Sequence, residues 1–133
     1  MTEADVIQPS ASIASTGLGI RYIGNRAYCF SGELALSTSL QDFLNFTTGS
    51  GYIVADINFT GDYDALGADW VTFNIKLNGT NVFLSKMERN NSEWMNYAKI
   101  LLPPFTEVQI EGKVQDGTPT FTCVLVGRVY GAT

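Results

Sequence analysis

The 133-residue chain contains no histidine, and this absence removes the side chain that most often serves as a general base in catalysis. Serines are numerous, but none lies in a G-x-S-x-G sequence, so a nucleophile of the hydrolase type has no support. Two cysteines without histidine also exclude a conventional four-ligand zinc site. The sequence therefore predicts a protein that is not an enzyme and that uses no cofactor.

Charged residues are few, at 16% of the chain, whereas typical soluble domains have roughly 25%. A surface with little charge favours burial against other subunits. The net charge is −5, and the eight lysines and arginines are scattered along the sequence. Without a basic stripe, neither nucleic acid nor an anionic membrane is an expected partner.

Long apolar runs are also missing, since no segment approaches the ~20 residues that span a bilayer. Residues 1–19 lack the basic start and apolar core of a secretory signal, so we expect synthesis and retention in a reducing cytoplasm. Cys29 and Cys123 are then expected to be small buried apolar side chains, although a disulfide between them stays open.

Short runs of alternating apolar and polar residues, separated by Gly, Asn, Asp and Pro, make up most of the chain and predict β-strands. These runs cover residues 26–36, 40–47, 52–60, 69–77, 81–88, 97–102, 105–114 and 120–130. The run 40–47 also fits a helical turn, whereas Asn78-Gly79 predicts a tight hairpin. Eight strands predict an all-β antiparallel β-sandwich of jelly-roll type over residues 21–133. An immunoglobulin-like sandwich is less suitable because its Cys…Trp…Cys spacing is missing.

The first 20 residues differ from the rest, because they are small, polar and without a clear period. Such a segment is either a disordered tail or an extended N-terminal arm that orders against a neighbouring subunit. We expect the arm.

Three groups of residues are candidates for a site. The acidic segment 62–69 has three aspartates that could bind Ca²⁺, although a plain solvated loop fits better and no metal site is predicted. Glu33, Glu107 and Glu111 could in principle supply a glycosidase pair, but Glu107 and Glu111 fit better as one solvated strand face. Tyrosine and tryptophan suit interfaces and sugar stacking, and we expect Tyr22, Tyr28 and Trp94 to lie at an interface.

Three segments resemble small virion-associated proteins of tailed phages, notably marine ones. They are the glycine-rich stretch of residues 17–28, the stretch Leu-Pro-Pro-Phe-Thr-Glu-Val at 102–108, and the stretch Leu-Val-Gly-Arg-Val-Tyr-Gly at 125–131. The resemblance implies a capsid decoration protein, a cement protein or a head fibre. Such proteins are often β-sandwich trimers that sit where capsomers meet.

The expected function is therefore that of a virion structural protein on the capsid exterior, which binds the major capsid protein or another virion protein and forms a homotrimer. Its arm and its subunit interfaces would cement the shell through many weak contacts multiplied by symmetry. A carbohydrate- or receptor-binding module of a fibre or spike is the second hypothesis.

Overall fold

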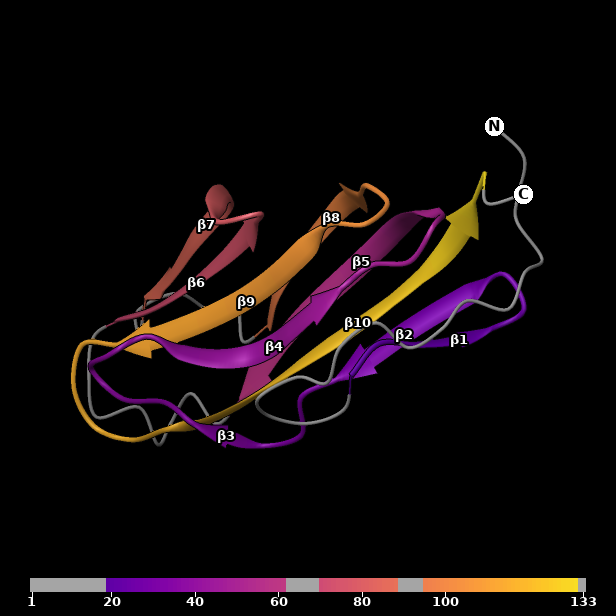
Figure 1. Cartoon of the computed structure of the whole chain (residues 1–133). Helices are drawn as coiled ribbons and strands as arrows, with labels where there is room; N and C mark the ends of the chain where they lie inside the picture. Colours follow the sequence, from indigo (N-terminus) through magenta and orange to yellow (C-terminus); the bar gives the residue numbers. More distant parts are fainter. Residues whose placement is uncertain (1–18, 62–69, 89–94, 132–133) are drawn as a thin grey trace.

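A computed structural model describes residues 19–61, 70–88 and 95–131 of the chain. Ten β-strands are formed within these ranges (Figure 1). They are β1 (Arg21–Ile23), β2 (Arg26–Phe30), β3 (Leu34–Ala35), β4 (Gln41–Thr47), β5 (Tyr52–Gly61), β6 (Trp70–Leu77), β7 (Thr80–Glu88), β8 (Met95–Leu102), β9 (Glu107–Val114) and β10 (Thr120–Tyr130). A membrane-crossing helix is not found anywhere in the described ranges.

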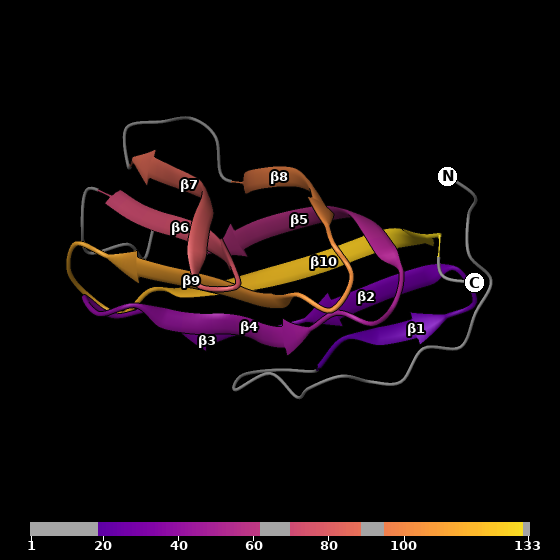
Figure 2. The ribbon, with the colours of Figure 1, turned by 45° about the horizontal axis from the view of Figure 1, so that its top comes forward.

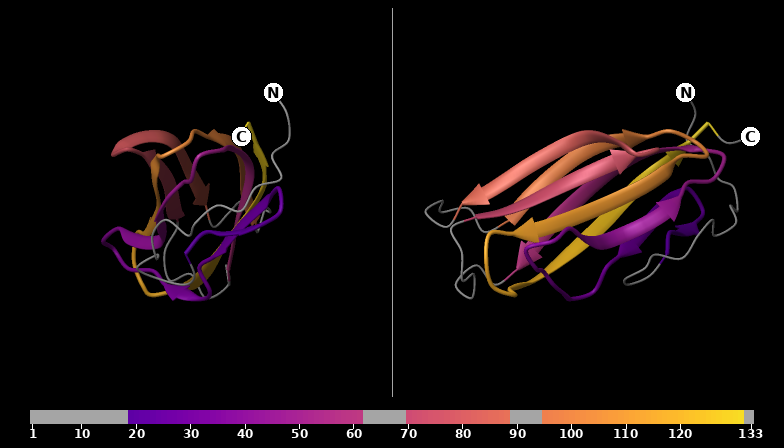
Figure 3. Two further views of the ribbon diagram at one scale, coloured as in Figure 1. Left: turned by 45° about the vertical axis from the view of Figure 1, so that its right-hand side comes forward. Right: turned by 60° about the vertical axis from the view of Figure 1, so that its left-hand side comes forward.

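The strands form two antiparallel sheets that face each other, as Figure 2 and the left view of Figure 3 show. Sheet A has the order β1-β2-β10-β5-β8, with β3 also paired to β10. Sheet B has the order β4-β9-β6-β7. The eight longer strands thus make two four-stranded sheets in the order of a jelly roll, which confirms the predicted fold class.

Period-2 alternation places one side of each strand in the core, as predicted for β5, β6 and β10. On β5, Ile53, Ala55, Ile57 and Phe59 are fully buried, while the residues between them point outward. The Asn78-Gly79 hairpin is also confirmed, because both residues have positive φ, at 50° and 83°. That conformation matches the twist of two directly connected strands.

Four phenylalanines from both sheets form the centre of the core. Phe73 contacts the other three, with ring centroids 4.3 Å from Phe59, 5.6 Å from Phe121 and 6.0 Å from Phe43. Gly112 makes room for this cluster, since a Cβ atom there would lie 2.7 Å from the Phe43 ring. The cluster therefore depends on a glycine in the middle of β9.

Two strands differ from their predicted form. The run 26–36 is interrupted at Gly32, whose φ is +70°, and both halves, β2 and β3, pair with β10. The run 40–47 is a strand rather than a helical turn, and its register shifts between Asp42 and Leu44. The shift lets the consecutive residues Phe43 and Leu44 both be buried.

Phe105 does not belong to a strand, contrary to the predicted run 105–114. It has a φ of 52° and is 72% exposed, just before β9 begins. Its backbone N–H donates to Gly49 O at 2.9 Å. Buried Thr48 holds the same loop, because its Oγ1 donates to Pro103 O at 2.7 Å and accepts from Thr106 N at 2.8 Å. The loops after β4 and β8 are thus fastened together beneath an exposed aromatic side chain.

Both cysteines are free and fully buried, which confirms that they act as small apolar side chains. Cys29 lies opposite Leu125 across the β2–β10 pair, so Cys123 is its diagonal neighbour. Diagonal neighbours are about 7–8 Å apart, which exceeds the usual Cα separation of a disulfide, about 4.4–6.8 Å. Burial raises the pKa of the Cys29 thiol to about 12 and the pKa of Cys123 still further.

Candidate functional site

The outer face of sheet A, here called the A face, carries an unusual share of exposed apolar side chains. Ten large apolar residues are exposed within the described residues, and six of them lie on this face. The six are Ile23, Phe30, Tyr52, Tyr97, Leu101 and Val126. They come from five of the six strands of the sheet, so the apolar character extends across its whole width. Exposed apolar side chains in this number on one face are typical of contact surfaces.

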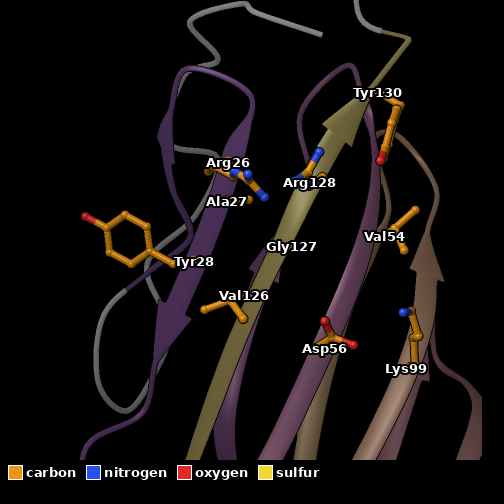
Figure 4. A pocket seen from close by; sticks show the side chains of 10 residues that line it. All are labelled: Arg26, Ala27, Tyr28, Val54, Asp56, Lys99, Val126, Gly127, Arg128 and Tyr130. Atoms are coloured by element: carbon orange, nitrogen blue, oxygen red, sulfur yellow. The ribbon is translucent and has the colours of Figure 1, made fainter. Parts of the chain in front are cut away.

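A groove of about 510 Å³ lies in the A face and is lined from β2, β10, β5 and β8. Arg26 and Arg128 are directly opposite each other across the β2–β10 pair and stand at one end of the groove (Figure 4). Asp56 and Lys99 face each other across the β5–β8 pair on the far side, and Val126 forms part of the floor. The register of three strand pairs therefore brings four charged groups together.

The groove is positively charged although the protein is acidic. Three cations, Arg26, Arg128 and Lys99, stand against one carboxylate, Asp56, which gives the groove a net charge of +2. Because the whole chain has a net charge of −5, the residues outside the groove carry a net charge of −7. Neither Arg26 nor Lys99 forms an ion pair with a carboxylate in the described part of the chain. Two like charges directly opposite each other in a sheet repel each other.

Asp56 is held by Tyr97, which lies on β8 next to it. The Tyr97 hydroxyl donates a hydrogen bond to Asp56 Oδ1 at 2.7 Å. This hydrogen bond, together with the nearby carboxylate charge, raises the pKa of the exposed Tyr97 phenol. One oxygen of the only carboxylate in the groove is thereby occupied, which leaves the cations as the groups best placed to bind a ligand.

The structure describes two of the three predicted interface residues, and these two lie on opposite faces of sheet A. Tyr28 lines the groove, with its ring turned away from β10 and 5.2 Å from the ring of Phe30 (Figure 4). Tyr22 instead packs against the core, and its hydroxyl accepts a hydrogen bond from Gly49 N at 3.0 Å. Burial raises the pKa of Tyr22. Trp94 lies outside the described residues.

A second polar cluster lies on the outer face of sheet B and corrects the expectation for Glu111. Glu111 is only 6% exposed, although it was expected on a solvated strand face. Its Oε1 accepts from Asn74 Nδ2 at 2.9 Å and pairs with Lys76 Nζ at 3.0 Å. Gln109 then donates to both Glu111 and Asp42. Because the side chains of this cluster bond to one another within the sheet, we interpret the cluster as a structural network.

The other acidic candidates lie apart from that cluster. Glu107 is exposed at the start of β9, and Glu33 lines a separate depression near the start of β10. The segment 62–69, considered for Ca²⁺, lies outside the described residues. Within the ranges that the structure covers, no group of three acidic or cysteine side chains could hold a metal ion.

No protein-family model matches the chain, and no curated protein matches it in sequence. Solved structures of similar fold include two with a TM-score of 0.54. One is a protein of the Bacillus endospore appendages, which are disulfide-linked pili; it is 11% identical, over 80% of this chain and 88% of that chain. The other is from Clostridium perfringens ZmpB, in a structure of CBM51-2 with GlcNAc and INT domains; it is 15% identical, over 96% of this chain but 31% of that chain. At these identities the likeness shows a shared β-sandwich fold.

Proposed function

We propose that this chain is a non-enzymatic structural subunit of a virion surface, which decorates or cements the capsid of a tailed phage through the A face. The observation that carries the proposal is the spread of six exposed apolar side chains over five of the six strands of sheet A. A surface of this kind gains free energy when another protein covers it. The major capsid protein and further copies of the chain are the proposed partners.

Two further observations support a role in an assembly. The segments at 17–28, 102–108 and 125–131 resemble small virion-associated proteins. The sandwich is also stiff, since its core is continuous between the sheets and its end loops are fastened by Thr48. A rigid module loses little conformational entropy when it binds, which suits many weak contacts repeated by symmetry.

The contact face is tested with Leu101→Asp on β8 and with Leu84→Asp as the matched control. Both leucines are exposed, at 47% and 72%, but Leu84 lies on β7 of sheet B. We expect sedimentation velocity to show weaker self-association for Leu101→Asp only. If the wild type associates and the two variants behave equally, the A face is not the surface through which the copies associate.

The virion location needs a separate test, in which antibodies against the purified chain are applied to intact particles of the phage that encodes it. Gold labelling of the heads in electron micrographs is the expected result. Labelling confined to tail fibres would instead favour the second candidate, a receptor- or carbohydrate-binding module. The specific feature in favour of that candidate is the groove, where Tyr28 and Tyr130 adjoin several charged groups. Absence of labelling would overturn both.

A further inference from the structure

We infer that the basic groove of the A face binds carboxylate side chains of a second copy of this chain in a head-to-tail contact, so that the face recognises a different surface of its neighbour. This inference rests on the proposed function, because it assigns a partner and a geometry to the same face.

The groove offers donors suited to carboxylates. Arg26 and Arg128 are neighbours across β2–β10, and each guanidinium presents donors in a planar fork that matches a carboxylate. Lys99 adds a third cation across the groove. Asp56 offsets one of these three positive charges, so the described lining of the groove keeps a net charge of +2. One oxygen of Asp56 also accepts a hydrogen bond from Tyr97.

The position of the groove argues against symmetric self-packing of the A face. Exposed apolar residues lie on both sides of it, with Ile23 and Phe30 on β1 and β2 and Tyr97 and Leu101 on β8. If two copies packed A face to A face about a two-fold axis, their basic grooves would meet in the middle of the contact. Juxtaposed like charges disfavour such a contact strongly.

The remaining surface provides the complementary charge. Outside the groove the chain carries a net charge of −7, so another copy of the chain is a source of carboxylates that is present wherever the protein is. A face that binds a different surface of its neighbour makes a heterologous contact, which closes into a ring or continues as a filament. The homotrimer expected from the sequence is one such ring.

The test uses the full-length chain with Arg26→Gln/Arg128→Gln and, as a matched control, Lys86→Gln/Lys113→Gln. Both double variants lose two positive charges, but Lys86 and Lys113 lie on sheet B. We expect sedimentation velocity at low salt to show self-association of the wild type and of the control. The groove variant should bind itself roughly thirtyfold or more weakly. Raising the salt from about 0.05 M to about 0.5 M should weaken the wild-type contact as well.

A mixing experiment tests the head-to-tail geometry. The groove variant retains its acidic surface, so a trace of labelled groove variant should still co-sediment with unlabelled wild type, although it does not associate with itself. Failure to co-sediment while the wild type associates would mean that each partner must supply a groove, and would overturn the inference. Thermal unfolding of each variant confirms that it is folded, and the single variant Lys99→Gln repeats the test without changing either arginine.

The remaining outcomes separate this inference from the proposed function. A wild type that stays monomeric at low salt overturns the second copy as the occupant, while the capsid remains a partner for the A face. Binding of oligogalacturonate to that monomer, lost in the groove variant, would assign the groove to an acidic saccharide. If Leu101→Asp abolishes association and the groove variant does not, the contact face stands and the inference about the groove fails.

Discussion

Replacing Thr48 by valine should destabilise the fold far more than its size suggests. Thr48 is 1% exposed, and its Oγ1 is the acceptor for Thr106 N and the donor to Pro103 O. Valine fills almost the same space but leaves both backbone groups without this partner. An unsatisfied buried polar group costs about 1–3 kcal/mol, so we expect the free energy of unfolding to fall by about 2–4 kcal/mol.

Two controls separate the hydrogen bonds from the packing. Thr48→Ser keeps the hydroxyl and loses one methyl group, which should cost only about 1 kcal/mol. Thr106→Val, in the same loop, loses one hydrogen bond to Pro104 O at 3.0 Å, and should also cost about 1 kcal/mol. Urea denaturation followed by tryptophan fluorescence gives the three values. If serine proved as harmful as valine, packing of the methyl group would be responsible, and the reasoning from hydrogen bonds would be refuted.

Three further predictions follow from other parts of the molecule. Arg26→Gln should raise the free energy of unfolding by about 0.2–1 kcal/mol, because it removes a like-charge pair with Arg128; a loss of stability in urea denaturation would contradict this. Phe105→Gly should leave the free energy of unfolding within about 1 kcal/mol of the wild type. Glycine adopts the positive φ of this position without strain, and this gain offsets the larger conformational entropy that glycine gives the unfolded chain. A melting temperature well below that of the wild type would count against a strained loop. Burial raises the pKa of both cysteine thiols in the folded protein. As the pH rises above about 9, the unfolded chain therefore loses these protons before the folded protein does. The free energy of unfolding should then fall by up to about 1.4 kcal/mol per pH unit for each thiol. Urea titrations between about pH 8 and pH 11, repeated with the Cys29→Ala/Cys123→Ala variant, test this, because the slope should be smaller without the thiols.

The strands could be predicted from the sequence because each one has a buried and an exposed side. The alternation along β5 and β10 identified their core residues, and Asn78-Gly79 marked a hairpin from two residues alone. Gly32 indicated a possible bulge from its residue type alone, but the division of the run into β2 and β3 depends on how both halves pair with β10.

The site could not be predicted in the same way. Arg26 and Arg128 are far apart in the sequence, and the basic residues therefore looked scattered; only the β2–β10 register makes these two neighbours. The burial of Glu111 likewise depends on Asn74 and Lys76 from another strand. Alternation predicts which side of a strand is buried, but it does not predict what stands beside an outward-facing residue.

The place of β10 in sheet A also has a consequence for how the protein is made. β10 is the last strand in the described chain, yet it lies between β2 and β5 and pairs with both. While residues 120–130 are still in the ribosome, β2 and β5 have no partner between them, and their open edges can pair with other chains. The groove is completed only when β10 arrives, because Val126, Gly127, Arg128 and Tyr130 line it, so an unfinished chain has no groove.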